Sequence, residues 1–142
     1  MDMNRIARIL LIMVAVAAVG CAQQAPAYQP KFPGDKAHSE AEARALGYMR
    51  TLVTAQKLYK KKHGQYAASL TALAGSGSFT KRMAKTDRGE YVVGFKPKPD
   101  GYTLTLTPRQ FDATRRAFYT DESGVIRGEE SRPATASSPA LS

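Results

Sequence analysis

The stretch from Ser39 to Leu73 constrains the fold more than any other part of this sequence, because it predicts one long amphipathic helix with a defined start and stop. Ser39 followed three residues later by Glu42 is a capping box, in which the serine hydroxyl accepts one backbone N–H and the glutamate reaches back to another. Lysines at 60–62 precede Gly64, and cations followed by glycine are typical of a helix C-terminus. The helix is expected to be roughly 36 Å long. Its buried stripe is predicted to comprise Ala45, Leu46, Met49, Leu52, Val53, Ala55, Tyr59 and one polar exception, Gln56.

A second, short helical turn is predicted after the glycine. Leu70 and Leu73 are three residues apart and are expected to pack on the long helix together with Tyr66, while Ser69 caps the turn. The Gly- and Ser-rich residues 74–78 lack the spacing of a phosphate-binding loop and indicate a linker.

The C-terminal half predicts an antiparallel sheet with one buried and one solvated face. Tyr102, Leu104 and Leu106 alternate with three threonines, as in a half-buried strand. Asp100-Gly101 is typical of a hairpin turn. The expected strands are residues 90–96, 102–107, 116–120 and 125–127. Together these features predict an α+β fold, in which a long N-terminal amphipathic helix packs on a sheet of three or four antiparallel strands.

Two groups of residues resemble the head domains of type IV pilins and type II secretion pseudopilins. The first runs Tyr59-Lys-Lys-Lys-His-Gly64-Gln-Tyr66 and continues to a Ser-Leu-x-x-Leu turn ending at Leu73. The second is an aromatic-Thr-Asp hairpin at 118–127 that closes on glycine and Ile-Arg. The resemblance covers about 40–127 and implies a pilin-like head with a role in a secretion or pilus-type system. Because the prepilin cleavage motif and the apolar half of the pilin helix are missing, it implies a tethered head rather than a filament subunit.

The first 21 residues predict a bacterial lipoprotein signal. A basic start is followed by an apolar run at 9–19, too short to span a bilayer, and the run ends Ala18-Val19-Gly20-Cys21. This resembles a lipobox, in which Cys21 is acylated and becomes the new N-terminus. An ordinary secretory signal with a chance cysteine is the alternative. Since Ala22, not aspartate, follows the cysteine, the lipoprotein sorting rule implies the outer membrane, with the protein facing the periplasm.

The expected domain organisation follows from these features. Residues 1–20 are the signal peptide, 21–38 a flexible proline-rich tether, 39–128 the pilin-like domain, and 129–142 a disordered tail rich in Ser, Pro and Ala.

The net charge of +9 favours an anionic neighbour such as nucleic acid, lipid head groups or a wall polymer, although a solvated basic surface also explains it. Tyrosines lie near the basic residues in sequence, as in proteins that bind single-stranded nucleic acid. The candidate polyanion-binding residues form two clusters, Lys57, Lys60, Lys61 and Lys62, and Lys81, Arg82, Lys85 and Arg88.

No residue pattern indicates catalysis, a metal or a cofactor. His38 and His63 lie at opposite ends of the predicted helix and cannot share a metal through helix spacing. The carboxylates of Asp121 and Glu122 are explained by turn formation. The sequence therefore favours a non-enzymatic, lipid-anchored envelope protein with structural or interaction roles, and a polyanion-binding lipoprotein is the alternative. The membrane, through the lipid, and envelope or secretion proteins are the expected partners.

Overall fold

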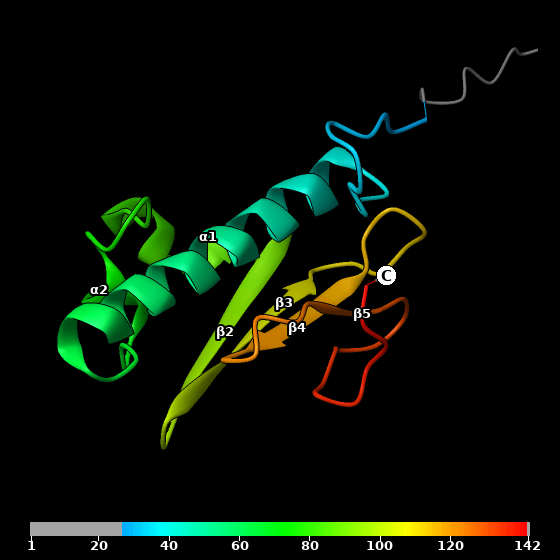
Figure 1. The fold of residues 1–142 in the computed structure, drawn as a ribbon. Coiled ribbons are helices and arrows are strands. Elements are labelled where there is room, and N and C mark those ends of the chain that lie inside the picture. Colours follow the sequence, from blue (N-terminus) through cyan, green and yellow to red (C-terminus); the bar gives the residue numbers. More distant parts are fainter. Residues whose placement is uncertain (1–26, 142) are drawn as a thin grey trace, which may run out of the picture.

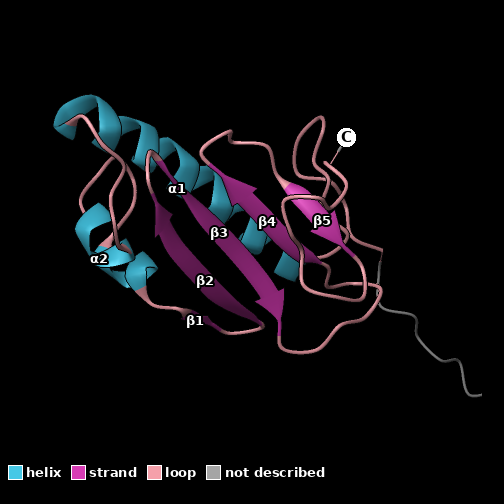
Figure 2. Cartoon of the chain, turned by 90° about the horizontal axis from the view of Figure 1, so that it is seen from below, coloured by secondary structure: helices cyan, strands magenta, loops and turns pink. Residues whose placement is uncertain are grey.

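A computed structural model describes residues 27–141, so the predicted signal 1–20 and the predicted lipidation site Cys21 lie outside the described residues. One long helix crosses one face of an antiparallel sheet, and short helical segments lie beside it at one sheet edge (Figures 1 and 2). The predicted α+β class is confirmed. In chain order the elements are α1 (Glu40–His63), α2 (Leu70–Leu73), the 3₁₀ helix η1 (Lys81–Ala84), β1 (Asp87–Arg88), β2 (Tyr91–Lys98), β3 (Gly101–Pro108), β4 (Ala117–Asp121) and β5 (Arg127–Glu129).

Two details differ from the predicted fold. The long helix lies at residues 40–63 and not at the N-terminus of the chain. The sheet has five strands in the order β1-β2-β3-β4-β5, where three or four were expected. The additional strand, β1, contains only Asp87 and Arg88, which pair with Val92 and Tyr91 of β2. Two polar residues give no alternation of apolar and polar side chains, so the signal used to predict strands is missing there.

The predicted caps of α1 are present. The Ser39 hydroxyl accepts the backbone N–H of Glu42 at 3.1 Å. Gly64 adopts a left-handed conformation, φ +78°, and donates its N–H to the Lys60 carbonyl. The reach of Glu42 differs from the expected capping box, because its carboxylate accepts the N–H of His38 at 2.8 Å instead of that of Ser39. The cap therefore includes one more residue of the preceding segment.

The hairpin of β2 and β3 supplies the sheet side of the core. Tyr102, Leu104 and Leu106 are buried while the intervening threonines are half-buried, which confirms the predicted alternation. Lys98 pairs with Gly101, so Pro99 and Asp100 form a two-residue turn, in which Asp100 has φ +54°. Aspartate tolerates this left-handed backbone better than most residues.

The core lies between α1 and the inner face of the sheet. Met49 and Leu52 of α1 and Leu104 and Phe118 of the sheet have no exposed surface. Burying each such side chain contributes about 1.5–3 kcal/mol. None of the described helices is both long enough and apolar enough to cross a membrane.

Gln56, the polar exception in the predicted stripe, is fully buried and holds the chain that follows α1. Its side-chain carbonyl accepts the N–H of Ala67 at 2.8 Å, and its side-chain amide donates to the Ala67 carbonyl at 3.2 Å. This pair of bonds positions the segment between Gly64 and Leu70 against the helix. The polar residue thus supplies a connection that an apolar side chain cannot make.

Part of the predicted flexible tether packs on the domain. Residues 27–38 have no helix or strand, yet Ala37 is buried in the core cluster and Tyr28 packs against it. Asp35 organises this segment, since its carboxylate accepts the Tyr28 hydroxyl at 2.6 Å and the Lys31 backbone N–H at 2.9 Å. The prolines exclude a helix here, but they do not prevent an ordered turn.

Residues 129–141 also differ from the expected disordered tail. Ala134 packs with Ala117 and Tyr119 on the face of β4 that points away from α1. The backbone N–H of Leu141 donates to the Ile126 carbonyl at 3.0 Å, so the tail returns alongside β5. The small, polar residues of the tail have the composition of a linker, which is why disorder was predicted. The apolar surface on which the tail packs comes from β4, and the composition of the tail does not report it.

Candidate functional site

The positive charge of the protein is concentrated on its helical side. Residues 43–86 contain nine Lys and Arg and no Asp or Glu. This stretch includes most of α1 together with α2 and η1. The other described residues, 27–42 and 87–141, carry ten Lys and Arg and eleven Asp and Glu. A long stretch without acidic residues indicates a cationic face. The two predicted basic clusters contain only part of this face, because they omit Arg44 and Arg50.

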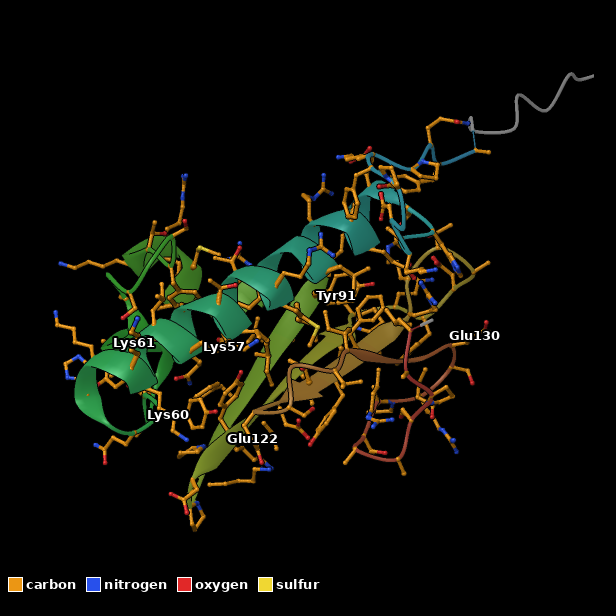
Figure 3. The ribbon with its side chains drawn as sticks, viewed as in Figure 1. Lys57, Lys60, Lys61, Tyr91, Glu122 and Glu130 are labelled. Atoms are coloured by element: carbon orange, nitrogen blue, oxygen red, sulfur yellow. The ribbon has the colours of Figure 1, made fainter. Side chains whose placement is uncertain are left out.

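The first predicted cluster lies at the C-terminal end of α1. Lys57, Lys60, Lys61 and Lys62 are all exposed, and Figure 3 shows the first three extending from the helix. The ammonium of Lys60 lies 4.5 Å from the ring centre of Tyr66, a cation–π contact. Lys60, Lys61 and Lys62 lie in the last turn of α1, where they complement the negative end of the helix dipole. This cluster is an open, solvated surface.

The second predicted cluster lies at the other end of the helical side. The chain leaves Leu73 and runs back along α1, so the guanidinium of Arg88 lies 4.4 Å from the ring centre of Tyr48. Tyr48 and Lys60 are twelve residues apart on one helix, about 18 Å. The structure therefore does not bring the two clusters together. Arg82, Lys85 and Arg88 share one pocket, and Lys81 does not line it.

The pocket that these residues share opens between α1 and β1. Its volume is about 420 Å³, and Arg44 of α1 completes its cationic wall. Arg44 was not among the predicted site residues, because a lone arginine on an exposed helix face has no local signal. The uncharged part of the lining is Ala41, Ala45, Gly89, Tyr91 and Leu106.

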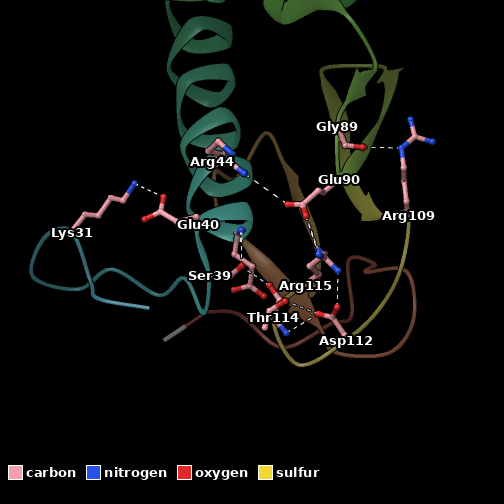
Figure 4. Close-up of polar contacts among 11 residues, drawn as sticks. Lys31, Ser39, Glu40, Arg44, Gly89, Glu90, Arg109, Asp112, Thr114 and Arg115 are labelled. Atoms are coloured by element: carbon pink, nitrogen blue, oxygen red, sulfur yellow. Dashed lines mark hydrogen bonds and ion pairs between the residues drawn. The ribbon is translucent and has the colours of Figure 1, made fainter. Parts of the chain in front are cut away.

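Two acidic residues also line this pocket, and both have partners outside it. Glu90 accepts from the Arg115 guanidinium at 2.9 Å and lies 3.8 Å from that of Arg44, as Figure 4 shows. Asp87 pairs with Arg109 at 3.0 Å. The hydrogen bond from Arg109, followed by the N–H of Gly89, lowers the pKa of Asp87 below its ordinary 3.8.

Tyr48 does not line the pocket, but it supports Arg88, which does. The side chain of Tyr48 is buried, and its hydroxyl donates to the Met83 carbonyl at 2.9 Å. Burial raises the pKa of Tyr48 to about 12, against a smaller opposing effect of Arg88, so the hydroxyl stays protonated at neutral pH. The ring therefore offers a fixed apolar face on which the Arg88 guanidinium rests.

The most buried charge of the described residues joins α1 to the sheet. Glu42 has no exposed surface, and its carboxylate accepts the backbone N–H of Arg116 at 2.8 Å and the Arg116 guanidinium at 2.9 Å. The same guanidinium donates to the Lys36 carbonyl at 2.7 Å. With the bond from His38, every oxygen of this carboxylate is occupied. The pair is a structural connection between helix and strand.

The other predicted candidates for chemistry remain apart. His38 precedes the N-cap of α1 and His63 is its last residue. Asp121 holds the β4–β5 turn by accepting the N–H of Ser123 at 2.9 Å, and Glu122 pairs with Lys98 at 3.1 Å. Within residues 27–141, no three His, Cys, Asp or Glu side chains gather as metal ligands.

Comparison with known proteins gives no relative for this chain: it matches no family model, no curated protein and no solved structure.

Proposed function

We propose that this protein is a lipid-anchored component of the bacterial cell envelope that acts by binding other envelope molecules and not by catalysis. The observation that carries the proposal is the segregation of charge, with nine cations and no acid over residues 43–86. A face of one sign suits recognition of a partner of opposite sign. The most buried ionisable pair, Glu42 and Arg116, has a structural role, because its hydrogen bonds hold α1 on β4. This use of the buried charges supports a role in binding and not in catalysis.

The pilin-like character of the head is part of the same proposal. The residues that carry the resemblance have packing roles: Tyr66 meets Tyr102 edge-on at 5.3 Å between ring centres, and the Ser69 hydroxyl caps α2 by accepting the N–H of Ala72. On this basis the protein serves a secretion or pilus-type system, anchored at the outer membrane through acylated Cys21 and facing the periplasm.

Affinity purification from native membranes tests the proposal. A tag after residue 142 leaves the N-terminus free for acylation, and a Cys21→Ser chain is the matched control. We expect the wild-type chain to take up labelled fatty acid and to retain secretion or other envelope proteins, and the control to lose the label. Label on the Cys21→Ser chain would refute the anchor, while a wild-type chain recovered alone after crosslinking would refute the interaction role.

A polyanion-binding lipoprotein is the second candidate, and the same acid-free stretch favours it. Nucleic acid or an anionic wall polymer would bind the cations through their phosphates or carboxylates and release counterions. Affinity should therefore fall steeply as salt rises. Binding to labelled single-stranded DNA, followed by anisotropy between low and physiological salt, tests this candidate, and absence of binding at low salt refutes it for nucleic acid.

A further inference from the structure

We propose that the pocket between α1 and β1 is a binding site for a phosphoryl group, held by Arg44, Arg82, Lys85 and Arg88. The inference deepens the polyanion-binding candidate above, on which it rests, by naming the chemical group that is recognised and the place where it binds. Four features of the pocket support this assignment: cations that the fold leaves largely unpaired, acids paired from outside, a fixed arginine and a suitable size.

Most cations of the pocket make no ion pair within the described protein. Among the described residues, no ion pair includes Arg82, Lys85 or Arg88. Arg44 makes one ion pair among the described residues, with Glu90 at 3.8 Å, and it is the longest of the ion pairs. Cations gathered in a concave site repel one another unless an anion joins them, so the arrangement favours an anionic ligand.

The acids at the rim do not cancel this charge. Glu90 is bound by Arg115 at 2.9 Å, and Asp87 is bound by Arg109 at 3.0 Å. Neither Arg115 nor Arg109 lines the pocket. Arg109 and Arg115, the latter shared with Asp112, therefore offset much of the acidic charge, and the pocket lining keeps a net positive charge for a ligand.

Arg88 is positioned before any ligand binds. Arg88 rests on the ring of Tyr48 at 4.4 Å, and Tyr48 is itself held by its bond to the Met83 carbonyl. A planar guanidinium stacked on an aromatic ring keeps its N–H donors available at its edge, in the fork geometry that suits two phosphoryl oxygens. Because this side chain is already ordered, binding loses less conformational entropy.

The size of the pocket indicates a ligand larger than a single phosphate ion. A volume of about 420 Å³ lies in the range of small-molecule sites, roughly 300–1,000 Å³. The apolar surface of Ala41, Ala45 and Leu106 can contact the carbon skeleton that bears the phosphoryl group. The recognised chemistry is thus a phosphoryl group on a small organic or inorganic carrier, free in solution or as part of a lipid head group.

Calorimetric titration of the full chain, purified in a neutral detergent, with inorganic pyrophosphate tests the site. The pocket variant is Arg82→Gln/Lys85→Gln/Arg88→Gln. The matched control is Lys60→Gln/Lys61→Gln/Lys62→Gln, which removes the same charge from the open end of α1. We expect the pocket variant to lose affinity by at least about tenfold, since it removes charged hydrogen bonds, and the control to change about twofold or less.

A second variant, Arg88→Lys, keeps the charge and removes the planar fork. We expect it to weaken binding while circular dichroism shows an unchanged fold, which separates recognition from folding. Because the lipid on Cys21 would insert into any vesicle, short-chain lipids added to the same detergent solution distinguish the sources. Heat of binding from short-chain phosphatidylglycerol but not phosphatidylcholine, lost in the pocket variant, assigns a lipid head group, and pyrophosphate binding without binding of phosphatidylglycerol assigns a soluble ligand.

The outcomes separate this inference from the function on which it rests. Equal loss of pyrophosphate affinity in the pocket variant and the control would overturn the site while leaving a diffuse polyanion-binding face. Pyrophosphate binding that is unaffected in the pocket variant, or absent from the wild-type chain, would also overturn it. Site-specific pyrophosphate binding by a chain that binds neither DNA nor wall polymer would uphold the pocket and refute the polyanion role.

Discussion

The contact between Glu42 and Arg116 gives the sharpest prediction about stability. In the folded protein the carboxylate has no exposed surface, while the side chain of Arg116 is 12% exposed. Replacing Arg116 by methionine keeps an unbranched stem and removes the charged guanidinium. The carboxylate then retains only the backbone N–H groups of His38 and residue 116 as donors. A buried charge left without its partner typically lowers stability by about 3–5 kcal/mol, and we expect Arg116→Met to fall in that range.

Arg115→Met is the matched control, one residue away. Arg115 also makes ion pairs, with Glu90 at 2.9 Å and Asp112 at 2.6 Å, but those carboxylates are 43% and 39% exposed. Exposed pairs contribute about 0–1 kcal/mol, because water and salt screen them. The two variants therefore differ in the burial of the partner carboxylate rather than in the type of residue removed.

Urea unfolding of both variants at neutral pH, followed by circular dichroism, measures the difference. The free energy of unfolding comes from the midpoint and the slope, and the slope should remain unchanged if the folded states are equally compact. Adding Glu42→Gln to each variant completes a double-mutant cycle, and we expect a coupling energy of about 1–3 kcal/mol with Arg116 and near zero with Arg115. If Arg116→Met costs no more than Arg115→Met, burial of this pair does not govern its contribution and the reasoning is refuted.

Two further predictions concern the segments that flank α1. Gln56→Leu leaves the buried N–H and C=O of Ala67 without partners and should lower the free energy of unfolding by about 2–4 kcal/mol. The control Gln65→Leu, at an exposed position, should change it by about 0.5 kcal/mol or less. Equal effects of the two variants in urea unfolding would contradict the role of the Gln56 amide. Acidification should destabilise the protein, because the bond from the Lys31 N–H, then the Tyr28 hydroxyl, lowers the pKa of Asp35 below its ordinary 3.8. A carboxyl with a lowered pKa stabilises the folded state fully above pH 3.8, and that contribution disappears as pH falls through the folded pKa. The melting temperature measured from pH 7 to pH 2 should therefore drop less steeply below pH 4 in Asp35→Asn, and an unchanged slope would contradict the assignment.

Local patterns in the sequence determined the elements whose evidence is local. Ser39 and Gly64 mark the two ends of α1, and the sequence shows them because capping depends on groups within one helical turn. The alternation at Tyr102, Leu104 and Leu106 identified the buried face of β3, since side chains in a strand point to opposite faces in turn. The acid-free stretch at residues 43–86 is likewise a property of the sequence alone.

Tertiary structure alone decided the features that depend on residues distant in the chain. The tail packs on the sheet because β4 presents Ala117 and Tyr119 to it. The pocket likewise combines Arg44 with basic residues about 40 positions later in the chain, and only the return of the chain along α1 brings them to one wall. The physical reason is the same in each case: hydrogen-bond pairing, burial and electrostatic field depend on distance in space, and sequence patterns report only the part of that environment that lies within a few residues.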